Sequence, residues 1–425
     1  MFYTLTMFVA LFAATFILML GSGLVGSLLS LRMGAEGFAA PLIGVIMAAF
    51  YAGLIFGSSL CPPIVRRVGH IRAFTAFAAI NTAATLCYPL WTNAPVWFVL
   101  RILTGISMMG MYMVVESWLN KQTRPQMRGR VFSVYMSVTF LGLGLGQLFL
   151  NVREIDGSDL FLVVGVCFAL CLVPMALTRS IHPELPESAS MKFGRIVRRA
   201  PMGLVGSFVA GLIGGAFYSL APVFAAQSGL QIDMVAYFIS LTILCGLLLQ
   251  WPVGILSDRV DRCRVLSTLS FLATIAALVI ILAAGRSQWL LLLTAGIYGG
   301  VAFTLYPVAV AHTNDRIENH EIVAASTVLI LCYGIGAFFG PLGASVAMAL
   351  VGSSGLYLFI ALATALLGVT LVVGRRMEKP MAENPVPYVP SPNTSPVIAS
   401  IHPYGESEDE DDEDLSDGGQ ESVGG

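Results

Sequence analysis

The chain has 425 residues, of which 56% are hydrophobic and only 11% are charged. An ordinary soluble protein has about 25% charged residues, so this composition excludes soluble enzymes and nucleic-acid binders. Ten of the 25 acidic residues lie in the stretch 406–421, so the formal net charge of −2 hides a basic remainder. The seven cysteines include no CxxC pair, which indicates neither a disulfide framework nor a metal site.

Continuous apolar runs divide most of the chain. A helix needs about 20 apolar residues to cross a bilayer, and an outer-membrane barrel would show alternation instead. Twelve runs meet this length: 5–29, 41–60, 73–91, 95–119, 131–150, 160–178, 202–226, 234–256, 265–284, 288–311, 322–350 and 354–373. The first run lacks a basic leader and is too long for a signal peptide, so we interpret it as a retained span. The sequence therefore predicts an all-α membrane protein with twelve transmembrane helices.

Basic residues are distributed unevenly between the connections. If both termini are cytoplasmic, 19 of the 23 Lys and Arg residues lie on the cytoplasmic side, and three lie outside. This bias predicts that orientation.

The longest connection on that side, 179–201, separates residues 1–178 from residues 202–374, with six runs in each part. We expect two six-helix bundles joined by a cytoplasmic linker. The tail, 375–425, is Pro-rich and then acidic, so we predict that it is disordered and solvated, with partner binding as the alternative.

The two halves repeat a basic loop. The second copy, Gly254-x-Leu-x-Asp258-Arg259-x-x-Arg262, resembles the cytoplasmic signature of the major facilitator superfamily. The first copy contains Arg66, Arg67 and Gly69, with Arg66 where the signature has Asp and Pro62 where it has its first Gly. The resemblance implies two pseudo-symmetric six-helix bundles, the major facilitator fold. It also implies that these loops clamp one state of a transporter, and Asp315 is the expected partner of Arg259 or Arg262.

Further short motifs support the same resemblance. Arg101-x-x-x-Gly105 is similar to the family's fourth-helix signature, and Gly336, Gly340 and Pro341 are similar to its Gly-Pro helix-packing signature. Gly142 and Gly146 form a glycine-rich counterpart in the fifth run, without the proline. The stretches 115–120 (VESWLN) and 258–264 (DRVDRCR) resemble a bacterial branch of the family without an assigned substrate. The resemblance thus implies the cytoplasmic (inner) membrane of a bacterium.

Arg101 and Glu116 are the charged residues inside the runs, both in the fourth. A charge near the centre of a membrane helix costs about 2.5–3.5 kcal/mol or more, so it normally faces a cavity or a partner. With Tyr112 they lie on one helical stripe, because fifteen residues rotate the helix by about 60° beyond whole turns. We expect this stripe to respond to substrate or protons. The alternatives are that Arg101 extends towards the outer surface and that Glu116 pairs with Arg66 or Arg67.

Other polar side chains complete the expected cavity, since spans one, seven and ten line it in the family. These candidates are Ser22, Tyr218, Tyr298 and Tyr306. We expect Gln147 and Gln250 to form helix–helix hydrogen bonds, and His312 to be solvated at the membrane edge.

These features predict a secondary active transporter that moves a small organic solute by alternating access. The sequence lacks a phosphate-binding GxxxxGK[ST] motif, and we expect no cofactor, no metal, no nucleic-acid partner and a monomer.

Proton coupling through Glu116, the one carboxylate inside the runs, is expected, with facilitated diffusion or another ion as alternatives. The apolar cavity favours efflux over uptake, and an uptake permease or facilitator is the alternative. A membrane enzyme would need embedded catalytic clusters that the runs lack. A non-transporting sensor that signals through the acidic tail is the other alternative.

Overall fold

The computed structural model describes residues 2–123, 127–177, 193–318, 321–375, 387–389 and 394–397. Within these ranges, twelve helical spans are long and apolar enough to cross a membrane. They coincide with the twelve runs of the sequence, so the all-α, twelve-span prediction is confirmed. The linker residues 179–192 and the acidic stretch 406–421 lie outside the described residues.

The first half contains α1 (Phe2–Ala35), α2 (Ala40–Val68), α3 (His70–Cys87) with η1 (Tyr88–Leu90), α4 (Ala94–Gln122), α5 (Arg128–Gly146) with η3 (Gln147–Asn151), and α6 (Asp159–Leu170) with α7 (Leu172–Ala176). The second half contains α8 (Phe193–Arg199), α9 (Pro201–Gln227), α10 (Ile232–Arg259), α11 (Arg262–Ala283), α12 (Gln288–Ala302) with α13 (Leu305–Asn314), α14 (Ile322–Val351) and α15 (Gly355–Gly374).

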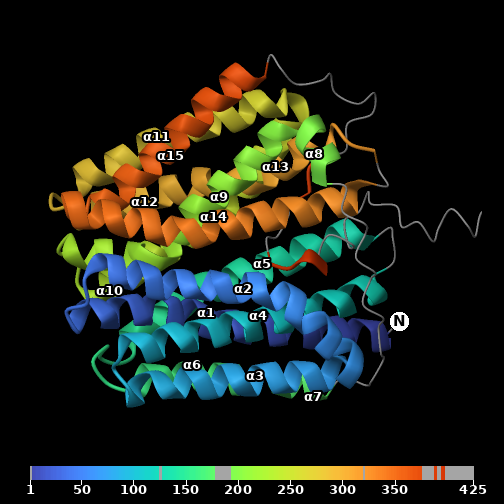
Figure 1. Cartoon of the computed structure of the whole chain (residues 1–425), viewed down its shortest axis with the longest axis vertical. Helices are drawn as coiled ribbons and strands as arrows, with labels where there is room; N and C mark the ends of the chain where they lie inside the picture. Colours follow the sequence, from blue (N-terminus) through green and yellow to red (C-terminus); the bar gives the residue numbers. More distant parts are fainter. Residues whose placement is uncertain are drawn as a thin grey trace, which may run out of the picture.

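The two halves lie side by side with their helices roughly parallel (Figure 1). Within the halves, α2 packs on α4 and α9 packs on α14. Across the interface, α2 contacts α14, α1 contacts α9, and α5 contacts α10. This is the pair of six-helix bundles that the repeat predicts.

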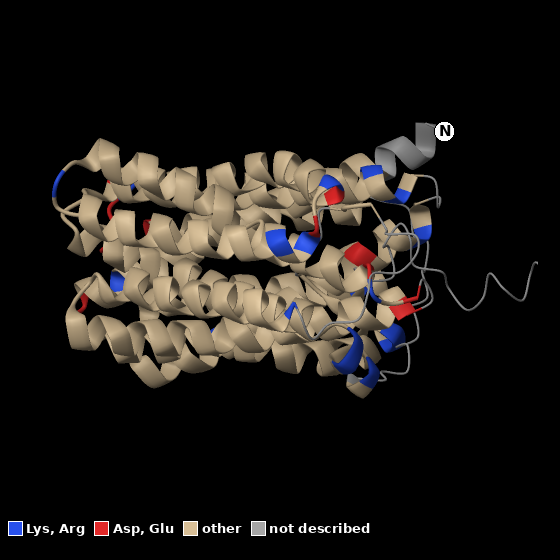
Figure 2. Cartoon of the chain, turned by 90° about the horizontal axis from the view of Figure 1, so that it is seen from above, with Lys and Arg blue, Asp and Glu red and all other residues tan. Residues whose placement is uncertain are grey.

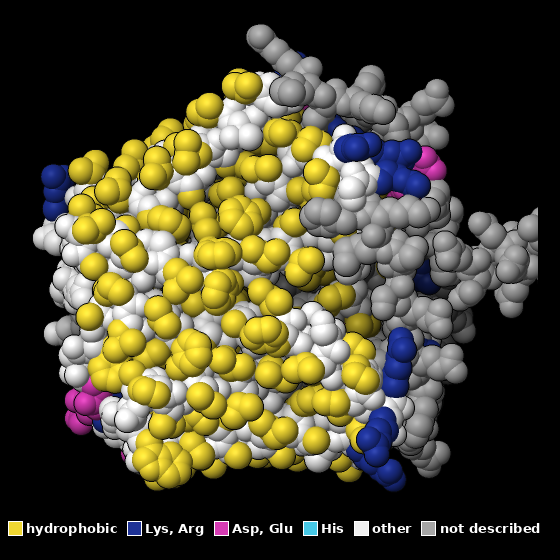
Figure 3. Space-filling model, in the orientation of Figure 1, with side chains coloured by type: hydrophobic (Ala, Val, Ile, Leu, Met, Phe, Trp, Pro, Cys, Tyr) yellow, Lys and Arg dark blue, Asp and Glu magenta, His cyan; other side chains and the backbone are white. Residues whose placement is uncertain are grey.

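Charged residues gather at one end of the bundle. Figure 2 shows most Lys and Arg residues at the end that also carries the N-terminus. Hydrophobic side chains cover the face shown in Figure 3 between the two ends. Exposed apolar residues of the spans include Trp251, which is 75% exposed, and Leu248, which is 70% exposed. We call the charged end the basic end. A belt of exposed apolar side chains between two polar ends is what a bilayer requires.

Glycines allow close contact between neighbouring helices within each half. A Cβ at Gly336 or Gly340 of α14 would overlap the α9 carbonyl oxygens of Phe208 or Leu212. In the first half, a Cβ at Gly146 would overlap Leu20 O, and one at Gly142 would lie 2.5 Å from Met19 Cβ. The predicted packing glycines therefore lie at helix–helix contacts, and Pro341 is accommodated inside α14.

Candidate functional site

A cavity of about 460 Å³ lies between the two halves. Its wall is built by α1 to α6 with η1 and η3 on one side and by α9, α10, α12, α13 and α14 on the other. Five of the predicted residues line it: Ser22, Arg101, Tyr112, Tyr218 and Tyr306. The volume falls in the range of sites that bind small organic molecules.

Arg101 is the charged residue of this lining among the residues that the structure describes. Its side chain does not extend to the surface, because the residue is only 5% exposed. The guanidinium carbon lies 4.5 Å from the centre of the Phe50 ring, a cation–π contact. Its Nε has no hydrogen-bond partner, and no described carboxylate forms an ion pair with it. The site therefore presents a desolvated cation that an anionic group can pair with.

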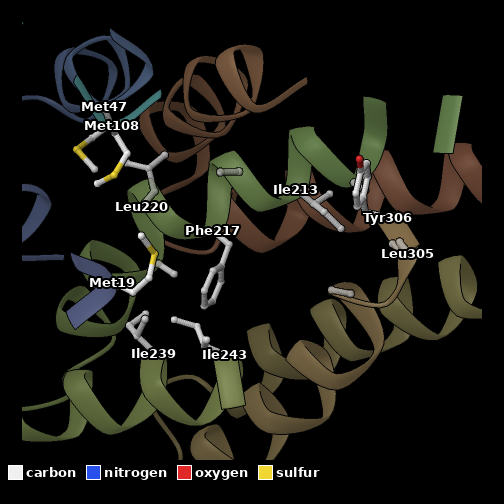
Figure 4. Packing of buried hydrophobic residues seen from close by; sticks show 14 of the residues in the cluster. Met19, Met47, Met108, Ile213, Phe217, Leu220, Ile239, Ile243, Leu305 and Tyr306 are labelled. Atoms are coloured by element: carbon white, nitrogen blue, oxygen red, sulfur yellow. The ribbon is translucent and has the colours of Figure 1, made fainter. Parts of the chain in front are cut away.

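Aromatic rings form much of the remaining wall. Tyr218 and Phe303 stack with ring centres 5.6 Å apart, and Phe303 also contacts Phe140 of the other half. Figure 4 shows Met19 of α1 beside Phe217 of α9, so apolar packing joins the halves next to the cavity. Such a wall suits a solute with an apolar body.

The two buried glutamines differ in their partners. Gln147 accepts a hydrogen bond from Ser27 Oγ at 2.6 Å and donates to Gly23 O at 2.8 Å, which joins η3 to α1 as expected. Gln250 is 3% exposed and lines the cavity, but neither polar atom of its amide has a partner among the described residues. The expectation of a helix–helix hydrogen bond is wrong for Gln250, whose amide is available to a solute.

Tyr298 does not line the cavity. It is fully buried behind Phe217 and packs against Tyr357, with ring centres 6.2 Å and 5.5 Å away. The helix that carries Tyr298 is apolar on all sides, so its hydrophobic pattern does not predict where the side chain points.

Glu116 lies one helical turn beyond Tyr112 and is fully buried. Tyr135 OH donates to its Oε1 at 2.8 Å, and the tail residues Thr394 and Ser395 donate to Oε1 and Oε2. Arg66 and Arg67 are exposed, so the expected pairing with either of them is not seen. Glu116 does not line the cavity, contrary to expectation, whereas its partner Thr394 does.

An ion-pair network lies at the basic end of the second half. Arg262 donates to Asp315 Oδ1 and to Asp258 Oδ1, both at 2.8 Å, and to Ala311 O. Asp315 is thus the partner of Arg262, and Arg259 is exposed.

The first-half copy of this loop differs from the second-half copy. Its Arg66 and Arg67 form no ion pair with a described residue, while Gly69 has φ +86° between α2 and α3.

His312 is not solvated, contrary to expectation. It is fully buried in α13, and its Nδ1 lies 3.1 Å from Arg316 Nη1. The helix continues to Asn314, so the residue belongs to the packed interior of the basic end.

Three residues that contact the helices here were not predicted from the sequence: Tyr388, Thr394 and Ser395. Tyr388 N donates to Asp258 Oδ1 at 2.8 Å. Their Pro-rich surroundings are typical of disordered segments, and no local pattern signals contact with helices more than 100 positions away. The described residues form no cluster of three or more His, Cys, Asp or Glu that could hold a metal ion.

Comparisons with known proteins agree with this architecture. The family model of the Major Facilitator Superfamily matches residues 11–249 and 204–401. The chain is 28% identical over 348 residues to the uncharacterized MFS-type transporter Ent638_1421 of Enterobacter sp. (strain 638), covering 81% of this chain and 90% of that protein. It is 27% identical over 354 residues to the uncharacterized MFS-type transporter YcaD of Shigella flexneri, covering 83% and 91%.

Solved structures share the fold. The nucleoside transporter NupG superposes with a TM-score of 0.70 at 12% identity, covering 86% of this chain and 98% of that chain. A bacterial homolog of the human lysosomal transporter Spinster, in an inward-facing and occupied conformation, gives 0.69 at 14% identity, covering 88% and 96%. The chain is a multi-pass membrane protein and a transporter rather than an enzyme. It belongs to the Major Facilitator Superfamily.

Proposed function

We propose that this protein is a secondary transporter of the bacterial inner membrane that moves an amphipathic organic anion by alternating access. The observation that carries the proposal is the cavity between the halves, in which Arg101 is a buried cation among aromatic and apolar side chains. A carboxylate or sulfonate would pair with the guanidinium, and Gln250 would donate or accept a further hydrogen bond. The apolar body of the solute would lie against Phe303 and Tyr218.

The arrangement of the halves supports alternating access. At the end opposite the basic end, α2 packs tightly on α14, because a Cβ at Gly44 would overlap Ser345 and lie 2.6 Å from Pro341 O. Rocking of the halves about the cavity would open that end and close the basic end. The concentration of Lys and Arg residues at the basic end supports the assignment of that end, and of both termini, to the cytoplasm.

Glu116 is the proposed coupling group, and efflux is the proposed direction. A carboxylate that is fully buried among hydroxyl donors is well placed to exchange a proton as its surroundings change between states. An apolar, aromatic cavity suits amphipathic solutes, which can enter from the membrane or the cytoplasm.

A ligand screen followed by flux measurements tests these assignments. Purified full-length protein would be heated with aliphatic and aromatic carboxylates and sulfonates, each matched with its neutral amide. We expect the anions to raise the apparent melting temperature more than the amides do. Arg101→Gln should weaken anion binding tenfold or more, equivalent to about 1.4 kcal/mol per tenfold, while Arg101→Lys keeps part of it. Arg130→Gln, at an exposed arginine, is the matched control.

Each stabilising solute would then be tested for flux in proteoliposomes with and without a pH gradient. We expect the gradient to drive flux in the wild type and not in Glu116→Gln. Stabilisation by neutral solutes alone would overturn the anion assignment and leave the transporter proposal standing. Binding without flux of any solute would contradict the transporter proposal and support a sensor.

A further inference from the structure

Two short segments of the C-terminal tail, 387–389 and 394–397, contact the helices at the basic end (Figure 1, the red segment beside α5). They lie within the range 375–425 for which the sequence predicts disorder. The segments attach to different halves of the transporter, and their contacts are specific.

The first attachment is to the N-terminal half. The hydroxyls of Thr394 and Ser395 donate to the two carboxylate oxygens of Glu116. Ser395 is fully buried, and its Oγ also accepts from Val397 N at 3.3 Å. An ionised carboxylate only accepts hydrogen bonds, so three hydroxyl donors, including Tyr135, match the chemistry of Glu116.

The second attachment is to the C-terminal half. Tyr388 N donates to Asp258 Oδ1, the same oxygen that Arg262 binds. The Tyr388 ring covers Gly254, where a Cβ would overlap it. The neighbouring Val389 is 9% exposed. The tail is thus seated on the signature loop whose clamping role the family resemblance implies.

These attachments contact both halves. Six positions separate Tyr388 from Thr394, and six extended residues reach at most about 20 Å. Thr394 and Pro396 also line the cavity, so the described part of the tail lies between the basic end and Arg101. At the opposite end, α2 and α14 are in direct contact.

We propose that the tail, through its segments 387–389 and 394–397, is an internal ligand of the transporter: these segments dock at the basic end on Asp258 and on Glu116, and they block solute entry from that side. Since the tail occupies the space between the halves, it must leave before the basic end can close. Solute movement therefore requires the tail to be released. This inference concerns the tail and does not depend on the solute class proposed for Arg101.

Hydrogen–deuterium exchange on the full-length protein tests the docking. In the wild type, peptides from 387–397 should exchange at least tenfold more slowly than the intrinsic rate of an unstructured chain. The double variant Thr394→Ala and Ser395→Ala removes one attachment and should restore that intrinsic rate. Tyr388→Ala weakens the other attachment by removing the ring that packs on Gly254, while its backbone N–H remains, and it should raise the exchange rate as well. The control is Ser133→Ala with Ser137→Ala, whose hydroxyls bond the backbone of their own helix. Intrinsic-rate exchange in the wild type would overturn the proposal.

Thiol labelling tests the block itself. Thr139→Cys places a thiol in the cavity lining, and its modification by a membrane-impermeant maleimide would be followed by peptide mass spectrometry. We expect labelling from the basic side to become about tenfold faster when either attachment is removed and to stay unchanged in the control. Equal rates in the parent and in a Tyr388→Ala variant that elutes as a folded monodisperse protein would show that the tail does not block entry.

Discussion

Asp315 combines nearly complete burial with an ion pair to Arg262, its side chain being only 1% exposed. Burial raises the pKa of Asp315 to about 6, although the positive charges of Arg262 and Arg316 oppose the rise. The carboxylates of Asp258 and Asp261 raise it further. Between about pH 4 and pH 6 the folded protein holds a proton that an unfolded Asp, with a pKa of about 3.9, has released. Stability should therefore fall as the pH rises through this range and then level off.

Asp315→Asn should remove this part of the pH dependence. The apparent melting temperature of the detergent-purified wild type should be higher at pH 5 than at pH 7, and the difference should shrink in the variant. Asp156→Asn, at a side chain that is 76% exposed, should retain the wild-type profile. His312→Gln separates any contribution of the nearby imidazole. A wild-type slope in Asp315→Asn would contradict the assignment.

For single residues, the sequence predicts which buried positions carry a charge better than it predicts which way a side chain points. Arg101 and Glu116 were found because a charged residue inside an apolar run needs a cavity or a partner. Tyr298 was misplaced because a membrane helix is apolar on its lipid face and on its packed face, so periodicity cannot separate them. Ser395 could not be predicted, because its partner Glu116 is 279 positions away and the tail composition suggests no structure.

Among the helices, α9 and α14 pack most closely, and α14 provides its own control. A Cβ at Gly340 would overlap Leu212 O, whereas one at Gly334 would meet only Ile55 Cγ1 at 3.7 Å, an ordinary contact. We expect Gly340→Ala to lower the apparent melting temperature, because overpacking costs about 1–3 kcal/mol. Gly334→Ala should be neutral or slightly stabilising, since alanine favours the helix by about 1 kcal/mol over glycine. Equal melting temperatures for the two variants would show that α9 and α14 can separate without cost.

The sequence predicted where spans exist but not where they break. The tenth span is interrupted between α12 and α13, and Pro307 explains the interruption, because its missing N–H leaves the carbonyl of Phe303 without its helical partner. Pro174 similarly follows the break between α6 and α7. Pro252 and Pro341 lie inside unbroken helices, so a proline alone does not predict a break. Packing against neighbouring helices decides the outcome.

In the whole molecule, different elements lie between the halves at the two ends. At the basic end, tail residues Tyr388 and Thr394 donate to Asp258 and Glu116. At the opposite end, α2 and α14 are in direct contact. The direct contact lacks side-chain bulk at Gly44, so a larger residue there should keep that end open and shift the equilibrium between the two transporter states.

Gly44→Val tests this closure. A Cβ at Gly44 would overlap Ser345 Oγ, so the valine cannot fit while α2 and α14 are in contact. With Ser22→Cys as a reporter in the cavity lining, an impermeant thiol reagent added at the end opposite the basic end should label the variant several-fold faster than its parent. Gly34→Val is the matched control, because a Cβ at Gly34, near the same end of α1, meets nothing within 4 Å. If Gly44→Val folds and labels no faster than the control, the contact between α2 and α14 does not govern access, and the closing element must be sought between α1 and α9.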